Sequence, residues 1–239
     1  MSFKRTIPNL FTLGNLLFGC LAIIGIFQGQ LFYASILIGI AALFDLLDGF
    51  VARLLGVSSE LGKQLDSLAD VVSFGVAPGM MIWALLDHSA LPEKLENLKI
   101  LALLIPLFSA YRLGKFNIDK RQTQQFLGFP TPATAAFILS FPLIFNQEKP
   151  DFSWISETIY NPWFLISVAI VFSWLMVTEI PFMSLKFKDL RWKGNQNRYI
   201  LLLATIVLGI LFQFIAIPLV IFLFILISLI TAKRKKRIT

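Results

Sequence analysis

The chain has 239 residues, of which 57% are hydrophobic and only 15% are charged, and its mean hydropathy is +0.77. These values lie outside the range of ordinary soluble domains and predict an integral membrane protein. Lysine and arginine outnumber the acids by 21 to 14, but they stand in short clusters between apolar runs, a pattern typical of membrane topology signals that argues against a nucleic-acid partner.

The predicted elements are transmembrane helices, because apolar runs of about 17 to 25 residues recur along the chain between polar breaks. We expect an all-α polytopic bundle of about eight such helices that forms a single domain over residues 1–239. Seven helices are the alternative, if the last apolar stretch, around Pro218, is one long helix. In chain order the expected helices are Leu10–Phe27, Leu31–Leu55, Asp66–Leu86, Leu98–Phe116, Thr131–Phe145, Trp163–Leu185, Tyr199–Phe214 and Ala216–Ala232.

Basic residues are distributed unevenly over the connections between these helices. When the N-terminus is placed in the cytoplasm, all but three of the 21 lysines and arginines fall in cytoplasmic segments. Both termini are then cytoplasmic, which requires an even number of helices. The connection that carries Arg53 and Gly62 lies on the same side. We therefore expect a multi-pass protein of the cell membrane, with any site at this connection open to the cytoplasm.

The first helix carries a face of small and polar residues. Pro8, Thr12, Asn15 and Gly19 recur at steps of four, three and four residues, which places them on one side of a helix. Small and hydroxyl-bearing residues favour close packing of membrane helices. Asn15, an amide within an apolar run, also fits a face that binds a ligand. Both interpretations stay open for this face.

Four aspartates interrupt the apolar sequence of the second and third helices. Asp45 and Asp48 are three residues apart and Asp66 and Asp70 are four apart, so each pair lies on one face of a helix. An ionised carboxylate inside a membrane costs about 3 kcal/mol on insertion scales, and bound cations would offset that cost. If the two helices pack antiparallel across their short connection, the four carboxylates converge. Without histidine or cysteine nearby, they favour Mg²⁺ or Mn²⁺ over zinc, and two ions could be held.

Residues beside the aspartates suit a phosphate ligand. Gly49 and Gly62 leave room for a phosphate near the backbone, and Arg53 offers a fork of donors to phosphate oxygens. Magnesium keeps coordination positions for water and substrate phosphate, which favours phosphoryl chemistry over a closed structural site. A polar network that only packs helices would not require glycines and an arginine at these spacings. The residues therefore predict a metal-dependent pyrophosphate site.

These residues follow a single spaced pattern. It resembles, at every fixed position, the signature of the CDP-alcohol phosphatidyltransferase family. The resemblance implies that an alcohol hydroxyl displaces CMP from a CDP-linked membrane lipid, CDP-diacylglycerol, and that the enzyme is a homodimer. The pattern reads Asp45-x2-Asp48-Gly49-x2-Ala52-Arg53-x8-Gly62-x3-Asp66-x3-Asp70.

Roles for individual residues follow from the same resemblance. Asp45, Asp48 and Asp66 would bind the metal. Asp70 would be both a metal neighbour and the general base for the incoming hydroxyl. The CDP-lipid would contact residues of the first three helices, namely Pro8, Thr12, Asn15, Gly49, Ala52, Arg53 and Gly62.

The flanking segments resemble the phosphatidylserine synthase branch of this family, which implies L-serine as the acceptor. The resemblance covers about residues 5–140, and Gly114 and Lys115 replace the alanine and arginine that are more usual in that branch. Ser73, Arg112 and Lys115 are the candidate contacts for the acceptor. The segments that carry the resemblance are Pro8-Asn9-Leu-Phe-Thr12, Asp70 to Gly79, Tyr111 to Asn117 and Gly128 to Ala133.

Two other functions stay open. The same chemistry with glycerol 3-phosphate as acceptor would make the protein a phosphatidylglycerophosphate synthase. A cation transporter would also contain intramembrane acids, but such carriers usually repeat their sites in two halves, and no matching acidic site appears in the other half of this chain. Glu179, expected inside the sixth helix just before Pro181, fits a salt bridge with a neighbouring basic residue or a contact with the ammonium group of serine.

Overall fold

The computed structural model describes residues 3–119, 126–147, 153–183, 192 and 195–236 of the chain. Helices make up nearly all of the regular structure, and one pair of two-residue strands accompanies them. The elements in chain order are α1 (Phe3–Phe27), α2 (Leu31–Leu54), α3 (Glu60–Val71), the π-helical turn η1 (Val72–Val76), α4 (Ala77–Asp87), the 3₁₀ helix η2 (Glu93–Leu103), α5 (Leu104–Ile118), β1 (Phe126–Leu127), α6 (Thr131–Phe145), α7 (Ser153–Ile159), α8 (Pro162–Val177), β2 (Pro181–Phe182), α9 (Gln196–Phe212), the 3₁₀ turn η5 (Gln213–Ile215) and α10 (Ala216–Lys236).

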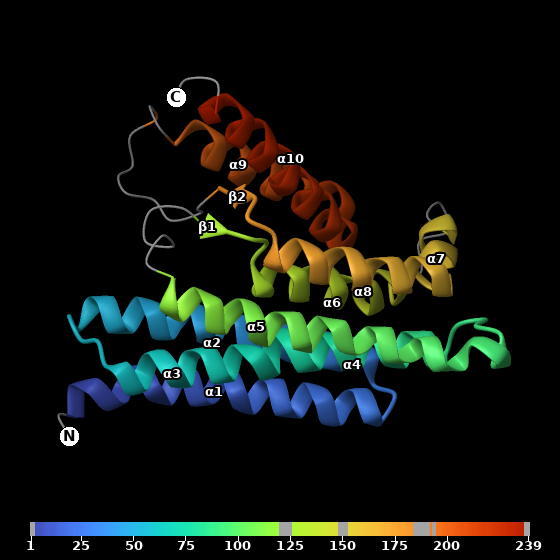
Figure 1. Ribbon diagram of the computed structural model, residues 1–239, viewed down its shortest axis with the longest axis horizontal. Helices are drawn as coiled ribbons and strands as arrows, with labels where there is room; N and C mark the ends of the chain where they lie inside the picture. The colour runs from blue at the N-terminus through green and yellow to red at the C-terminus, as the bar shows by residue number, and fades with distance from the viewer. Residues whose placement is uncertain (1–2, 120–125, 148–152, 184–191, 193–194, 237–239) are drawn as a thin grey trace.

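Long helices lie side by side along one direction, and the last two cross them at an angle (Figure 1). α3, η1 and α4 form one continuous rod, and η2 and α5 form another. Five stretches are long and apolar enough to span a membrane, and α6 and α8 are shorter apolar helices. An all-α integral membrane bundle is therefore confirmed. The five stretches are Thr6–Phe27, Leu31–Leu54, Glu60–Asp87, Glu93–Ile118 and Gln196–Ala232.

The last of these stretches consists of two helices. α9 ends at Phe212, the chain turns at Gln213, and α10 runs back alongside α9 (Figure 1). Asn197 Nδ2, near the start of α9, donates a hydrogen bond to Thr231 Oγ1, near the end of α10 (2.9 Å). Apart from the short α7, the described part of the chain therefore contains eight helical rods, as expected, and the seven-helix alternative is wrong.

The predicted start of the third helix is wrong. It begins at Glu60 and not at Asp66, because Ser59 caps it by accepting a hydrogen bond from the Gly62 N–H (2.9 Å). Gly62 therefore lies in the first turn of α3, and Arg53 lies in the last turn of α2. The connection is therefore shorter than expected, because α3 starts before Asp66, whereas α2 ends within one residue of the predicted Leu55.

The predicted end of the sixth helix is also wrong. The helix ends at Val177 and not at Leu185. Thr178 is extended (φ −63°, ψ 152°), and Pro181 has no N–H group with which to continue a helix. β2 pairs antiparallel with β1 instead. Glu179 consequently lies outside the helix, on the segment between α8 and β2.

The β1–β2 pair joins two connections that are far apart in the sequence, and it was not predicted. Beyond the strands, the Gly128 N–H donates to Ile180 O (3.1 Å) and the Phe129 N–H donates to Leu175 O (2.9 Å). Gly128 has a φ of +79°, and a Cβ there would lie 2.3 Å from Met176 O, so this close approach requires glycine. The chain before α6 is thereby held against the chain after α8. In the strands, Phe126 pairs with Phe182 and Leu127 with Pro181.

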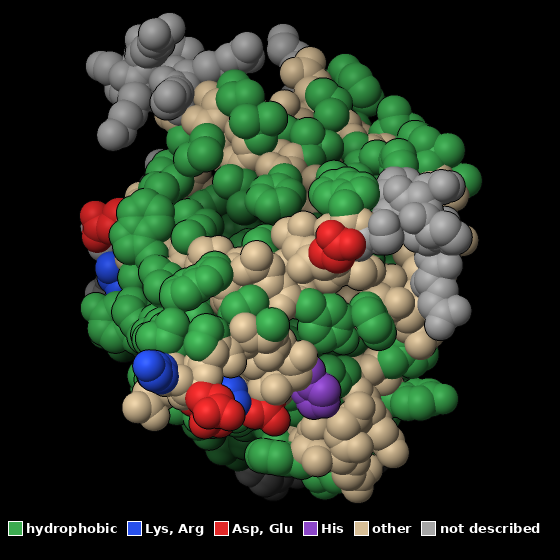
Figure 2. Space-filling model, turned by 90° about the vertical axis from the view of Figure 1, so that its right-hand side faces the viewer, with side chains coloured by type: hydrophobic (Ala, Val, Ile, Leu, Met, Phe, Trp, Pro, Cys, Tyr) green, Lys and Arg blue, Asp and Glu red, His purple; other side chains and the backbone are tan. Residues whose placement is uncertain are grey.

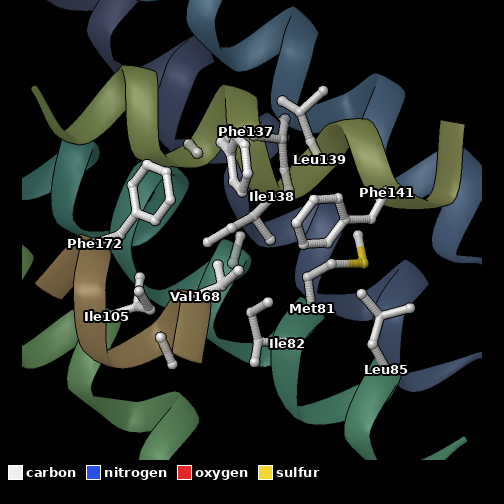
Figure 3. Packing of buried hydrophobic residues seen from close by; sticks show 14 of the residues in the cluster. Met81, Ile82, Leu85, Ile105, Phe137, Ile138, Leu139, Phe141, Val168 and Phe172 are labelled. Atoms are coloured by element: carbon white, nitrogen blue, oxygen red, sulfur yellow. The ribbon is translucent and has the colours of Figure 1, made fainter. Parts of the chain in front are cut away.

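The apolar core lies where α4 packs against α6 and α8 (Figure 3). Met81 and Ile82 of α4 and Ile138 of α6 are fully buried there. The rings of Phe137 and Phe172 stack with their centroids 4.5 Å apart, which links α6 directly to α8. This core keeps the long rods in fixed positions beside the aspartates.

Charged side chains are few on the end of the molecule that lies at the right in Figure 1. Figure 2 shows this end covered mostly by hydrophobic side chains, with a small charged group beside the single histidine, His88. Lys99 is only 8% exposed, and its Nζ lies 2.5 Å from Asp87 Oδ1 and 3.0 Å from Glu96 Oε1. Large hydrophobic side chains are also exposed along the helices, among them Leu21 of α1, Ile36 of α2 and Leu107 of α5, which fits contact with lipid acyl chains.

Candidate metal centre and active site

Carboxylates from two helices meet between α2 and α3. Asp45, Asp48 and Asp66 each offer a carboxylate oxygen within 4.8 Å of those of the other two. Asp48 is buried, and the other two are half-buried. α2 and α3 run in opposite directions from their shared connection, as the sequence predicts (Figure 1). This is the one cluster of three potential metal ligands among the described residues.

Asp70 lies beside this cluster. The residue is 8% exposed, and its carboxyl group interacts electrostatically with those of Asp45 and Asp66. Asn15 Nδ2, on α1, donates a hydrogen bond to Asp70 Oδ1 (3.2 Å). Asp70 is therefore oriented from α1, next to the three clustered carboxylates.

The polar face of α1 packs against the helices that carry the aspartates. Thr12 Oγ1 donates to Asp48 Oδ2 (2.7 Å), and both Thr12 and Asn15 are almost fully buried. Ser73 Oγ donates to Asn15 O (3.0 Å), and Gly19 makes room for this contact, because a Cβ there would lie 2.2 Å from Ser73 Oγ. The face therefore packs against these helices, and its polar groups hold the aspartates, while contact of Thr12 and Asn15 with the CDP-lipid stays a prediction. The expected contact between Ser73 and an acceptor stays a prediction.

The π-helical turn η1, between α3 and α4, contacts α1 on one side and α5 on the other. Ser73 faces α1, whereas Gly75 faces α5, where a Cβ would lie 2.9 Å from Ser109 Oγ. A π-helical turn is wider than an α-helical turn, and such turns occur often at functional sites. The wide turn follows Asp70 closely and lets the rod pack against α1 and α5 within a few residues.

The other residues expected to contact the CDP-lipid lie at the same end of the molecule. A Cβ on Gly49 would find nothing nearer than Arg53 Nη1 at 4.0 Å, so the space beside Gly49 is open, and Arg53 is exposed. Gly62 is more enclosed, with side-chain oxygens 3.0 Å from the position of a Cβ. Ala52 is half-buried and Pro8 is buried. Contact of these residues with the lipid stays a prediction.

α5 brings two basic residues to this region. Arg112 is 7% exposed, donates from Nη1 to Thr131 Oγ1 (3.4 Å) and interacts electrostatically with Asp70. Lys115 Nζ, one turn further on, lies 3.6 Å from Glu179 Oε1, so the salt bridge expected for Glu179 is confirmed. Both basic residues line a narrow pocket together with β1 and the end of α8. The lining residues are Tyr111, Arg112, Lys115, Leu127, Met176, Val177 and Thr178.

Asn117 and Ser67 were not predicted as parts of this site. Asn117 Nδ2 donates to Ser67 Oγ (2.7 Å), and Lys63 Nζ donates to Asn117 O (3.2 Å). These bonds hold the end of α5 against α3. Asn117 belongs to the segment Tyr111 to Asn117, which resembles the phosphatidylserine synthase branch, and this resemblance could have indicated its role. No pattern in the sequence indicates Ser67.

Comparison of the chain with known protein families identifies the family to which this site belongs. The family model described as CDP-alcohol phosphatidyltransferase matches residues 5–180, which contain all four aspartates. The chain belongs to this family. It is therefore an enzyme of the phosphatidyltransferase type, as the sequence pattern predicts. α9 and α10 lie outside the matched residues.

Several similar proteins carry names from the same area of lipid chemistry. A CDP-diacylglycerol–serine O-phosphatidyltransferase of Bacillus subtilis (strain 168) is 34% identical over 179 residues, which cover 74% of this chain and 89% of the relative. One of Helicobacter pylori is 31% identical over 198 residues, which cover 82% and 78%. An archaetidylserine synthase of Methanothermobacter thermautotrophicus is 39% identical over 139 residues, which cover 57% and 58%.

The carboxylate cluster of this transferase fits a divalent cation. Carboxylate oxygens are ligands that Mg²⁺ and Mn²⁺ prefer, and the cluster consists of them alone. Thr12 donates a hydrogen bond to Asp48, and hydrogen bonds of this type from residues that do not bind the metal commonly orient the carboxylates that do. The cluster therefore has both suitable ligands and a group that holds one of them in place.

Replacement of Thr12 by valine should weaken metal binding by this transferase. Valine keeps the shape of threonine but removes the hydroxyl that donates to Asp48, and loss of such a partner lowers metal affinity about 10- to 100-fold. The Mg²⁺ or Mn²⁺ concentration that gives half-maximal activity should rise by the same factor.

Thr205→Val is the matched control, because Thr205 Oγ1 donates within its own helix to Leu201 O (2.8 Å), away from the aspartates. An unchanged metal requirement in the Thr12 variant would contradict the role of this hydroxyl.

Proposed function

We propose that this enzyme transfers a phosphatidyl group from CDP-diacylglycerol to the hydroxyl group of L-serine and releases CMP. The observation that carries the proposal is the meeting of Asp45, Asp48 and Asp66, with Asp70 beside them, in a chain of this family. Serine as the acceptor is supported by the names of the relatives from Bacillus subtilis and Helicobacter pylori.

Asp45, Asp48 and Asp66 would hold a divalent cation, either Mg²⁺ or Mn²⁺, and Asp70 adds a fourth carboxylate with which two ions could be held. A bound cation supplies positive charge that stabilises the diphosphate and the departing CMP. In this proposal Thr12 and Asn15 act through the aspartates that they contact. The diphosphate lies near the open space at Gly49, where Arg53 can donate to its oxygens.

Asp70 is the proposed general base. Its carboxylate accepts the proton of the serine hydroxyl, and the serine oxygen attacks the phosphorus that carries diacylglycerol. The bond between this phosphorus and the oxygen of CMP breaks, and CMP leaves. The hydrogen bond from Asn15 fixes the orientation of the carboxylate for this step.

Arg112 and Lys115 are the proposed contacts for the serine carboxylate. The Arg112 guanidinium is buried and close enough to interact with Asp70, and Lys115 lies one turn away on α5. A guanidinium presents a fork of donors that matches the two oxygens of a carboxylate. This arrangement would bring the acceptor within reach of the general base.

The proposed site faces the cytoplasm. The α2–α3 connection lies at the same end of the molecule as the first turn of α1 and the last turns of α10 (Figure 1). The uneven distribution of basic residues supports a cytoplasmic position for that end. A single domain over residues 1–239 and the homodimer implied by the family resemblance stay predictions.

An acceptor panel tests the proposed function. The purified protein in vesicles that contain CDP-diacylglycerol, with Mg²⁺ or Mn²⁺, should release CMP and form phosphatidylserine when L-serine is added. It should not respond to glycerol 3-phosphate or inositol phosphate. Release that needs glycerol 3-phosphate would instead support a phosphatidylglycerophosphate synthase, and release without any acceptor would contradict both functions.

A further inference from the structure

Glu179 places a negative charge beside Lys115, one of the two basic residues in the narrow pocket between α5, β1 and the end of α8, hereafter called the acceptor pocket. Its Oε1 lies 3.6 Å from Lys115 Nζ, and Lys115 lines the pocket together with Arg112 and Thr178. The side chain of Glu179 is 65% exposed and that of Lys115 is 33% exposed, so both charges are accessible to a small molecule that enters. Among the described residues, Arg112 and Lys115 thus bring positive charge to this pocket, and Glu179 brings negative charge next to Lys115.

The segment that carries Glu179 is held at both ends. Thr178 Oγ1 donates to Leu175 O (2.9 Å) at the end of α8, and Ile180 O accepts from the Gly128 N–H (3.1 Å). β2 follows immediately and pairs with β1. Glu179 is therefore presented from a fixed stretch of backbone, which is a condition for a defined contact with a ligand.

The pattern of charges matches one class of acceptor. An α-amino acid carries a carboxylate and an ammonium group on the same carbon atom, so neighbouring positive and negative side chains can bind it. Sugar phosphates and glycerol phosphate carry negative charge alone, and a carboxylate near their phosphate would repel them. The charges of Arg112, Lys115 and Glu179 therefore favour a zwitterion.

We infer that Glu179 is a specificity residue that binds the ammonium group of a zwitterionic amino-acid acceptor and disfavours anionic acceptors. The inference rests on the proposed function, since it concerns the same acceptor pocket. Arg112 and Lys115 bind the carboxylate of the acceptor, and Glu179 binds its ammonium group from the segment after α8. Recognition of the acceptor therefore depends on a residue that the four-aspartate signature does not include.

Glu179→Gln tests this role when serine is compared with 3-hydroxypropionate, which has the same hydroxyl and carboxylate but no ammonium group. The KM for serine should rise roughly three- to ten-fold, the range expected for a charged contact that is partly exposed to solvent. The inhibition constant of 3-hydroxypropionate against serine should not rise, and glycerol 3-phosphate should inhibit more strongly. Both kcat and the KM for CDP-diacylglycerol should stay within about two-fold of the wild type.

Two further variants separate a direct contact from an indirect effect. Glu179→Asp keeps a carboxylate and should recover part of the affinity for serine. Glu157→Gln makes the same change of charge on α7, at the opposite end of the molecule, and should change none of these constants.

The inference is overturned if the KM for serine does not change in Glu179→Gln. It is also overturned if the constants for serine and 3-hydroxypropionate rise by the same factor, because Glu179 would then act only by positioning Lys115. Failure of the proposed function has a different signature, namely wild-type enzyme that releases no CMP in response to serine.

Discussion

Asp70→Asn should reduce phosphatidyl transfer by about 10²- to 10⁴-fold, the range that a positioned general base contributes. Asparagine fits the same space but cannot accept the proton of the acceptor hydroxyl. The three clustered carboxylates of Asp45, Asp48 and Asp66 stay in place, so binding of CDP-diacylglycerol should partly persist. CMP release and binding of labelled CDP-diacylglycerol, measured on the same preparation, would separate the two effects.

Asp87→Asn is a suitable control for this variant. It makes the same substitution at the opposite end of the molecule, where Asp87 pairs with Lys99, and should leave transfer unchanged. Normal turnover in Asp70→Asn would remove Asp70 from the role of base. Loss of both turnover and lipid binding would instead indicate that Asp70 mainly binds metal.

Removal of divalent cations should abolish transfer, and addition of Mg²⁺ or Mn²⁺ should restore it. Asp45, Asp48 and Asp66 bring three carboxylates together, and a bound cation would offset their mutual repulsion and the cost of burying them. Asp66→Asn replaces one of the three charged ligands and should raise the metal concentration needed for half-maximal activity by more than about 100-fold. CMP release measured against free metal concentration checks both expectations.

Glu60→Gln provides the comparison for Asp66→Asn, because it removes an exposed carboxylate from the first turn of the same helix. Its metal requirement should match that of the wild type. Full activity in the presence of excess chelator would contradict a metal-dependent reaction.

The convergence of the aspartates could be predicted because it depends on local rules. Helical spacing places Asp45 with Asp48 and Asp66 with Asp70, and a short connection forces the two helices to run antiparallel. The hydrogen bonds from α1 could not be predicted in the same way. The spacing of Thr12 and Asn15 revealed a polar face, but which side chain each residue meets depends on how α1 packs against helices distant in the sequence.

The region around Glu179 was predicted less well for a related reason. Hydropathy stays high across Ile180 and Phe182, which suggested a longer helix, and Pro181 was the local signal against it. The competing structure is a pair of two-residue strands, which is too short to leave a periodic pattern and whose partner strand lies before α6. Glu179 was therefore assigned to the wrong element, although its salt bridge was anticipated.

The π-helical turn η1 lets the two halves of the rod from Glu60 to Asp87 face different neighbours. One additional residue in a helical turn rotates everything after it by about 100° relative to an uninterrupted α-helix. The half that carries Asp66 and Asp70 is thus set by the site, whereas the half that carries Met81 and Ile82 is set by the core. Because both halves belong to one continuous helix, the offset at η1 allows the carboxylates to face the site while Met81 and Ile82 face the core, so the packing of the core also holds the carboxylates in place.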